Sequence, residues 1–331
     1  MLRHRRFLAL LLGAIVLVAA TAGVLWLIPS NHYIVLPDRI RPVDPLIKVP
    51  GEDGAVRDNG IYMVDVRVGR ASVFERLFPE VHEGASLVPE RVLNPVGISD
   101  RQRRASSLED MDRSQEIATT VALRSLGREV AVTPFGAQVV LVVPNAPADE
   151  KLRVGDVIVE VDGEPVRSSD ELLQAMEDLR PGDEVTLGVR REGDVEPVVL
   201  RTRAAEDDPQ RAVVGIQVRD DARFRFPVDV DINAGSIGGP SAGLAFALDI
   251  VDELGEDVDR GRKIVATGEL DLSGRVAPIG GIEQKTVAAR EAGADLFLVP
   301  DANAAEARKH ADGLRIVPVT TFDEALSELT S

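Results

Sequence analysis

A serine in a glycine-rich turn is the first residue of this chain that could perform chemistry. Ser241 lies in the sequence Gly-Gly-Pro-Ser-Ala-Gly at residues 238–243, at the start of an apolar stretch that predicts a buried helix over residues 240–254. Pro240 suits the first helical turn, because its missing N–H has no partner there in any case. At a helix N-terminus, unpaired backbone N–H groups and the helix dipole would favour a nucleophile and could hold an oxyanion. A serine at this position could equally serve only as a helix cap.

A lysine on a later predicted helix is the second candidate. In a helix that begins after Gly281, Lys285 falls on a stripe of otherwise apolar, small or hydroxyl side chains, whereas Gln284 and the charged neighbours fall outside it. Burial would disfavour the charged amine and lower its pKa, as a lysine general base requires. A lysine at the edge of such a stripe could instead extend its amine to solvent. The stripe comprises Ile282, Lys285, Thr286, Ala289, Ala292 and Gly293.

Composition and charge exclude several classes of function. The 331 residues are enough for two domains, and a hydrophobic content of 44% supports a sizeable core. The net charge of −17 argues against nucleic acid as a partner. The chain has no cysteine, which excludes disulfides and thiol catalysis, and its four histidines show no metal-site spacing. We therefore expect no metal and no other cofactor, and a Ser-His-Asp triad only if the fold brings a distant histidine to Ser241.

The amino terminus predicts a membrane anchor. Residues 7–28 are 22 residues without a charge, and a helix of that length could span a hydrocarbon core of about 30 Å. The arginines lie in residues 1–6, so the positive-inside rule predicts a cytoplasmic tail and extracytoplasmic domains after residue 28. A cleaved signal peptide is the alternative, with small residues at 20–22 as the cleavage site. The apolar run continues to residue 28, and this favours an uncleaved anchor.

The rest of the chain divides by composition. Residues 29–59 are rich in Pro, Asp and Arg and predict a linker. Alternation over 60–68 predicts a strand, and the apolar spacing over 109–126 predicts a helix. We group residues 60–127 as a region associated with the catalytic unit, which covers residues 210–331 and shows an α/β alternation.

Residues 128–205 predict a compact unit of their own. β-branched runs over 138–143 and 157–161 predict strands. Ser168 with Glu171 predicts a capping box for a helix over 170–179. A hairpin should follow across residues 192–194.

This unit resembles the PDZ domains of bacterial envelope proteases. The resemblance rests on three motifs in order: Val-Pro-Asn-Ala-Pro-Ala at 143–148, Leu-Arg-Val-Gly-Asp-Val-Ile at 152–158 and Asp-Gly-Glu-Pro-Val at 162–166. It implies a groove that adds a peptide as an extra strand and often grips its terminal carboxylate. A PDZ-like spacer without a ligand is the alternative.

The same resemblance implies where the peptide should bind. The carboxylate-binding loop should lie just before Gln138, near residues 134–136. We therefore expect Phe135, Gly136 and Gln138 to contact peptide C-termini or strands. The loop departs from the usual Gly-hydrophobic-Gly-Phe pattern.

The C-terminal unit resembles the proteolytic domain of Lon-type Ser-Lys peptidases. The resemblance implies that Ser241 is the nucleophile and Lys285 the general base. It also implies that Thr267 positions the lysine amine, and that backbone N–H groups around Gly239 and Ser241, in the turn with Pro240, form the oxyanion hole. The matching motifs are Gly-Pro-Ser-Ala-Gly at 239–243, Thr-Gly-Glu-Leu at 267–270, Gly-Arg-Val at 274–276, Pro-Ile-Gly-Gly at 278–281 before Lys285, Ala-Ala-Arg-Glu-Ala-Gly continuing to 293, and Leu-Val-Pro at 298–300.

Two departures from that family affect the interpretation. The chain has no Gly-x-x-x-x-Gly-Lys-Ser/Thr loop, so it encodes no nucleotide-driven unfolding. Many Lon enzymes have an acidic residue before Gly-Pro-Ser, whereas this chain has Gly238. The arrangement is similar to membrane-anchored, PDZ-containing Lon-like proteases of bacteria. That similarity implies an α/β (α+β) proteolytic fold with an inserted PDZ domain, so that strand 60–68 joins the catalytic sheet.

We therefore expect an ATP-independent, membrane-anchored serine endopeptidase that acts on unfolded or envelope polypeptides. A non-catalytic PDZ-containing adaptor is one alternative, although an adaptor has no need of a buried lysine. A phosphate-binding turn, as in small-molecule kinases, is another. Related proteolytic domains form rings, so the resemblance also implies a homo-oligomer.

Overall fold

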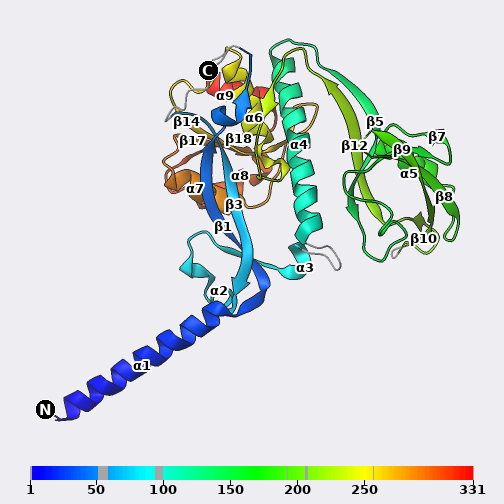
Figure 1. Ribbon diagram of the computed structural model, residues 1–331. Helices are drawn as coiled ribbons and strands as arrows, with labels where there is room; N and C mark the ends of the chain where they lie inside the picture. The colour runs from blue at the N-terminus through cyan, green and yellow to red at the C-terminus, as the bar shows by residue number, and fades with distance from the viewer. Residues whose placement is uncertain are drawn as a thin grey trace.

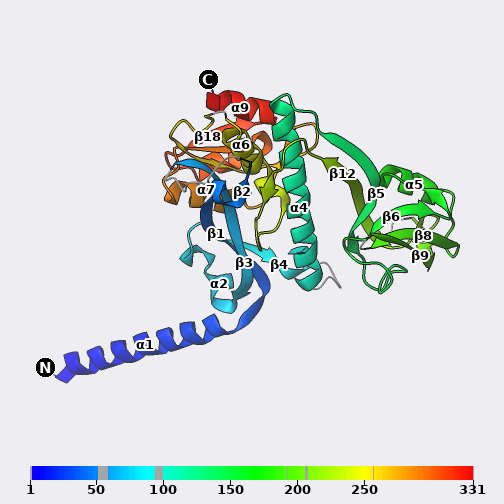
Figure 2. The ribbon, with the colours of Figure 1, turned by 45° about the horizontal axis from the view of Figure 1, so that its top comes forward.

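Two bodies, connected by a long helix and a two-stranded ribbon, make up the molecule in the computed structural model (Figure 1). The structure describes residues 2–50, 59–93, 100–191, 193–205, 208–255 and 257–330, with side chains from residue 11 onward except at positions 100 and 102. The connecting helix, α4 (Asp100–Ser125), runs between the two bodies in both views (Figures 1 and 2).

A mixed six-stranded sheet forms the centre of the first body. Its four strands from β18 to β3 are mutually parallel, whereas β1 and β4 are antiparallel to their neighbours. The predicted strand at residues 60–68 is therefore confirmed as part of the catalytic sheet. In order across the sheet, the strands are β18 (Arg315–Val319), β17 (Leu296–Pro300), β14 (Lys263–Ala266), β3 (Gly60–Ser72), β1 (Pro29–Pro42) and β4 (Ser86–Pro89).

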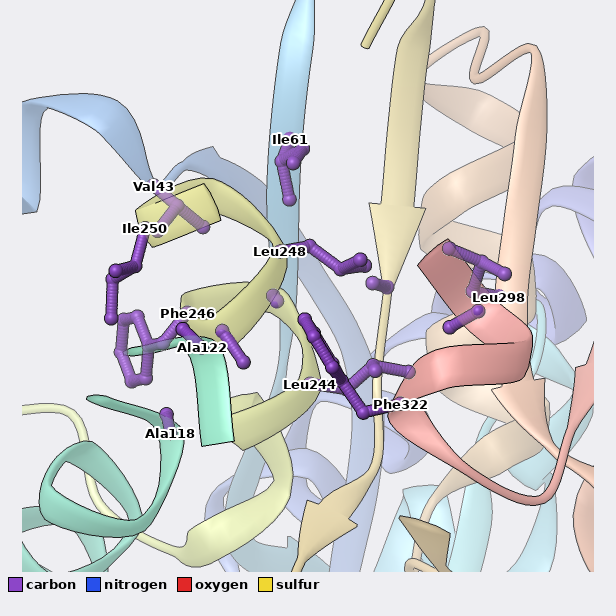
Figure 3. Packing of buried hydrophobic residues seen from close by; sticks show 14 of the residues in the cluster. Val43, Ile61, Ala118, Ala122, Leu244, Phe246, Leu248, Ile250, Leu298 and Phe322 are labelled. Atoms are coloured by element: carbon purple, nitrogen blue, oxygen red, sulfur yellow. The ribbon is translucent and has the colours of Figure 1, made fainter. Parts of the chain in front are cut away.

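Alternation along β3 explains why both faces of this sheet are covered. Ile61 and Met63 point into one core, and Tyr62 and Val64 into the other, because successive strand residues face opposite sides. Figure 3 shows the first core, where Leu248 of the helix after Ser241 lies near Ile61 and Leu244 of the same helix lies near Phe322. That face carries α6 (Gly243–Glu253), α4 and α9 (Phe322–Thr330), and the opposite face carries α7 (Ile282–Glu291) and α8 (Asp301–Lys309).

The helix α4 packs against α6 through small side chains. Ala118 and Ala122 are fully buried and lie beside Phe246 (Figure 3). The prediction of a helix over 109–126 is confirmed, but α4 begins earlier, at Asp100. Its first turns are polar and carry no apolar period, so hydrophobic patterning did not reveal them.

The second body is a six-stranded antiparallel sheet that carries the helix α5. Its core contains Val139, Ile158 and Leu187, all fully buried. The order is β12 (Ile216–Arg225), β5 (Ala131–Val142), β6 (Val157–Val161), β8 (Glu184–Arg191) and β9 (Asp194–Arg201), with β7 (Glu164–Pro165) paired to β6 and α5 (Ser169–Met176) packed on the sheet.

The start of α5 follows the predicted cap in part. Ser168 Oγ accepts a hydrogen bond from the Glu171 N–H at 3.1 Å, as expected. The Glu171 carboxylate accepts from the N–H of Arg167 at 2.8 Å instead of closing the predicted box on Ser168.

The predicted linker over residues 29–59 is wrong in its first part. Residues 29–42 form β1, which lies between β3 and β4 in the catalytic sheet. Its centre, residues 33–36, is apolar and buried, and this outweighs the prolines, which lie at the strand ends and beside a bulge at Pro37. Residues 51–58 of the expected linker lie outside the described residues.

A long helix, α1 (Leu2–Leu27), covers most of the predicted membrane segment and projects from the first body (Figure 1). Within the part of the chain that the structure describes, no helix is both long enough and apolar enough to cross a membrane.

The short elements are η1 (Asp44–Leu46), β2 (Ile47–Lys48), α2 (Val73–Leu77), η2 (Pro79–Val81), α3 (Glu90–Leu93), β10 (Arg203–Ala204), β11 (Ala212–Val213), β13 (Asp231–Ile232), η3 (Pro240–Ala242), β15 (Glu269–Leu270) and β16 (Val276–Ala277).

Candidate active site

The turn that carries Ser241 is built by glycine and proline. Gly239 has φ = +93°, a conformation that favours glycine. Pro240 then begins the short helix η3, which leads directly into the buried helix α6. Ser241 therefore lies at the amino end of a helical unit, as the sequence predicts.

The structure brings Ser241 of η3, Lys285 of α7 and Thr267, which follows β14, together in space. Lys285 Nζ lies 2.7 Å from Ser241 Oγ and 3.0 Å from Thr267 Oγ1. The lysine is only 3% exposed, and Thr267 is fully buried. Lys285 therefore does not reach solvent, and its amine faces the serine hydroxyl.

Burial changes the protonation of this lysine. Desolvation lowers the pKa of Lys285 from its ordinary value of 10.5 to about 8, against an opposing effect of the Asp65 carboxylate. Arg41 pairs with Asp65 at 2.7 Å and offsets part of that negative charge. At neutral pH about a tenth of the lysine would be a neutral amine, whose lone pair can accept the proton of Ser241.

The carbonyl group of Ser241 is also fixed. It accepts hydrogen bonds from Gly268 N–H at 2.9 Å and from Thr267 Oγ1 at 3.1 Å. Thr267 thus donates to the nucleophile's backbone while it accepts from Lys285. The serine and the lysine amine are held by the same hydroxyl.

The expected oxyanion role of Gly239 is not met in this arrangement. Its N–H donates to the carbonyl oxygen of Ser107, on α4, at 2.7 Å. Pro240 contributes no N–H, and its carbonyl accepts from the hydroxyl of Ser114 at 3.0 Å. Two residues of α4 that the sequence analysis did not single out therefore contact the nucleophile turn.

Helix α4 also explains why glycine precedes the Gly-Pro-Ser sequence. A Cβ at Gly238 would overlap Ser107 Oγ and lie 3.1 Å from both the Cβ and the carbonyl oxygen of Ser107. Any side chain at this position would therefore force Ser107 or the turn to shift.

The predicted stripe on α7 is correct for Lys285 but incomplete. Gln284, which we placed outside the stripe, is 2% exposed. Its amide donates to the Gly84 carbonyl at 2.6 Å and to Ser86 Oγ at 3.3 Å. The segment around Gly84 covers this side of α7, a tertiary contact that periodicity alone does not reveal.

The predicted peptide-binding residues of the second body do not line an open edge. Phe135, Gly136 and Gln138 all lie in β5, which pairs with β12 on one side and β6 on the other. A Cβ at Gly136 would lie 2.6 Å from the Ile158 carbonyl. The prediction is therefore wrong, because an interior strand has no edge to offer to a peptide.

The remaining contacts of Phe135 and Gln138 are internal. The guanidinium groups of Arg190 and Arg223 stack on the Phe135 ring at 3.6 and 3.5 Å from its centroid. Gln138 Oε1 accepts from Arg219, and its amide donates to Glu109 of α4. These residues stabilise the sheet and its contact with α4.

Strand β12 has the edge that β5 lacks. It pairs only with β5 within the described chain and lies beside α5, whose Ser169 donates to the Asp220 carboxylate. An edge strand flanked by a helix is the geometry that adds a peptide as a further strand. The sequence signal was present: Ile216 and Val218 alternate with polar residues after Gly215, which has φ = +81°.

The comparison with known families assigns a family to each of the two bodies. Residues 211–330 match the family model of the Lon protease (S16) C-terminal proteolytic domain, and residues 106–202 match that of the PDZ domain. The structure departs from these boundaries at two points. Strand β12 lies in the segment that matches the proteolytic domain but pairs in the sheet of the second body. Helix α4 lies largely in the segment that matches the PDZ domain but packs on the core of the first body.

Individual relatives point the same way. Lon protease 2 of Bacillus subtilis (strain 168) is 36% identical over 109 residues, 33% of this chain and 19% of that protein. Lon protease 1 of Myxococcus xanthus is 39% identical over 109 residues, 31% of this chain and 13% of that protein. The match thus spans about a fifth or less of the length of these relatives.

Among solved structures, a PDZ domain of an SdrC-like protein from Listeria monocytogenes is 26% identical, covers 25% of this chain and 86% of that one, and gives a TM-score of 0.24. The family matches carry the assignment of the second body. The chain therefore combines a PDZ domain with a Lon-type proteolytic domain of the serine protease class.

Proposed function

We propose that this protein is a serine endopeptidase that works without ATP and uses Ser241 and Lys285 as a catalytic dyad. The observation that carries the proposal is the 2.7 Å contact between Lys285 Nζ and Ser241 Oγ in a site where the lysine is 3% exposed. A buried amine with a lowered pKa, in contact with a serine hydroxyl, is the pair that serine activation requires.

The geometry supports the following reaction. Neutral Lys285 accepts the hydroxyl proton while Ser241 Oγ attacks the carbonyl carbon of the scissile bond. The lysine ammonium then protonates the leaving amine as the C–N bond breaks, and an acyl-enzyme ester remains. Water, deprotonated by Lys285, attacks this ester, and the proton returns to Ser241. Thr267 keeps the amine in place through its 3.0 Å contact.

The substrates we propose are flexible or unfolded polypeptides. A cleft of about 330 Å³ lies between α4 and β5, and its lining includes Val92, Val140 and Val142 together with Ser107, the residue of α4 that contacts Gly239 of the nucleophile turn. An extended chain could place apolar side chains there. Because the chain carries no phosphate-binding loop of its own, folded substrates should resist cleavage.

The PDZ domain would hold a peptide along β12. The main chain of the peptide would pair with the open edge of residues 216–225, and α5 would form the other wall. Arg113 of α4 donates to the Asp220 carbonyl at 3.4 Å, so the middle of β12 contacts the helix that also contacts the nucleophile turn.

For localisation, we propose a single membrane anchor at residues 7–28 with the folded domains outside the cytoplasm. The support is the uncharged run and the arginines before it. Carbonate extraction of isolated membranes and, separately, digestion of spheroplasts with an added protease test the proposal. Release by carbonate, or protection of the domains, would contradict it.

Casein digestion without ATP tests the catalytic proposal. The full chain should cleave casein, and Ser241→Ala and Lys285→Met should each abolish cleavage. Ser273→Ala and Lys309→Met are matched controls in exposed positions and should retain it. A correctly folded parent that cleaves neither casein nor a peptide library would favour the adaptor alternative.

A further inference from the structure

Helix α4 contacts the nucleophile turn through a buried hydroxyl. Ser114 is 4% exposed, and its Oγ donates to the carbonyl of Pro240 at 3.0 Å. The hydroxyl of Ser114 is closely packed, because a Cβ added at Gly243 would lie 2.9 Å from Ser114 Oγ. Ser114 precedes the segment that matches the Lon-type proteolytic domain, which begins at residue 211.

The contact bears directly on the backbone of Ser241. The Pro240 carbonyl and the Ser241 N–H belong to one planar trans peptide unit, so they point in opposite directions. The Pro240 carbonyl accepts from Ser114 Oγ and also from the Gly243 N–H of the same helical turn, so these two donors together fix the direction of the Ser241 N–H. On the other side, Thr267 and Gly268 hold the Ser241 carbonyl and fix the next peptide plane.

Of the described residues 239–241, Ser241 is the one whose N–H remains for an oxyanion. The Gly239 N–H is bonded to Ser107, and Pro240 has none. N–H groups in a first helical turn have no acceptor within the helix, so the Ser241 N–H can point at a substrate. Donors of this kind stabilise the charge that develops on the attacked carbonyl oxygen.

We infer that Ser114 is a positioning residue that aims the Ser241 N–H at the oxyanion of the tetrahedral intermediate. The inference rests on the proposed protease activity and assigns part of its machinery to α4. Ser114 touches neither the substrate nor Lys285 in this account. It acts through the Pro240–Ser241 peptide plane alone.

The test is steady-state kinetics of the full-length Ser114→Ala protein on a fluorogenic peptide derived from casein. We expect kcat to fall about tenfold to a hundredfold, somewhat less than when an oxyanion donor is removed outright. KM and the apparent pKa of kcat should not change, because substrate binding and Lys285 are untouched. Affinity for a peptide aldehyde, whose adduct carries the oxyanion, should fall in parallel with kcat.

Ser125→Ala is the matched control, since Ser125 lies on the same helix and its hydroxyl bonds to the Ala122 carbonyl within that helix. It should retain the parental kcat. If Ser114→Ala does not fold, Ser114→Cys decides the question, because a weak thiol donor should give an intermediate kcat.

Three results would overturn the inference: parental kcat in the Ser114 variants, a loss confined to KM, or a shifted apparent pKa. A parent enzyme that neither cleaves the peptide nor binds the aldehyde would contradict the proposed protease activity itself, and so differs from all three.

Discussion

The carbonyl oxygen of Ser107 accepts a hydrogen bond from the Gly239 N–H at 2.7 Å. This contact joins α4 to the turn that carries the nucleophile. Two turns further along α4, Ser114 holds the Pro240 carbonyl, and between them Asp110 pairs with Arg219 of β12 at 2.6 Å. One helix therefore contacts both the candidate active site and the edge strand of the PDZ domain.

Close packing between α4 and the turn makes position 238 sensitive. Gly238→Ala places a Cβ against Ser107, so we expect the turn to shift and kcat to fall by about tenfold or more. Ser107→Ala removes the nearest atom and should restore part of the activity. A double-mutant cycle on kcat measures this coupling, and strictly additive effects would show that Ser107 is not the cause.

The pH profile should report Lys285. Below pH 8 the amine is mostly protonated, so kcat should rise about tenfold per pH unit and level off above the pKa of about 8. Asp65→Asn removes a charge that raises the pKa of Lys285, so the profile should move to lower pH.

Arg41→Gln provides the opposite test. It leaves the Asp65 carboxylate without its 2.7 Å partner, so the pKa of Lys285 should rise and the profile should move to higher pH. A profile that stays fixed in both variants would indicate that a group other than Lys285 limits the rate.

A buried carboxyl group in α6 should limit stability at high pH. Asp249 is 2% exposed, and its Oδ2 has no hydrogen-bond partner among the described residues. Burial, followed by the neighbouring Glu253 and Asp252 carboxylates, raises the pKa of Asp249 well above its ordinary value. Because the folded pKa is raised, the contribution of Asp249 to the unfolding free energy is most favourable at acidic pH and falls as pH rises from about 4 through the folded pKa.

Asp249→Asn removes this pH dependence. Relative to the parent, we expect the variant to gain about 1–3 kcal/mol in unfolding free energy at pH 8 and much less at pH 5. Urea denaturation at the two pH values measures the difference, and Asp178→Asn on the surface should change little. A gain that is independent of pH, or a loss at pH 8, would rule out this account of Asp249.

Peptides should bind to β12 and not to β5. A C-terminal peptide selected from a library should protect residues 216–225 and α5 from hydrogen exchange, and N-methylation of alternate peptide amides should abolish binding, because strand addition depends on main-chain hydrogen bonds. Phe135→Leu should bind the same peptide, since the Phe135 ring is stacked between two arginines. Protection centred on residues 134–138 would restore the original prediction.

The sequence predicted those features that depend on local pattern. The turn at Ser241, the buried stripe with Lys285 and the strand at residues 60–68 follow from glycine chemistry and apolar periodicity, and the structure has all three. The 2.7 Å contact between Lys285 and Ser241 could be predicted only with the family resemblance as well, because no local pattern relates residues 44 positions apart.

Long-range packing accounts for what the sequence did not predict. The prolines of β1 led to the prediction of a linker instead of a strand. Gln284 is buried only because the segment around Gly84 covers it. The choice between β5 and β12 depends on sheet order, and the roles of Ser107 and Ser114 depend on where α4 docks. None of these can be read from the periodicity of a single segment.

The most direct test of the dyad is covalent labelling of the full chain with a peptidyl fluorophosphonate, read by mass spectrometry at pH 7 and pH 9. We expect one adduct, on Ser241, that forms faster at pH 9 and is nearly absent in Lys285→Met. Labelling of Ser241 at equal rates in the parent and Lys285→Met proteins, or of another serine in preference to Ser241, would contradict the proposed dyad.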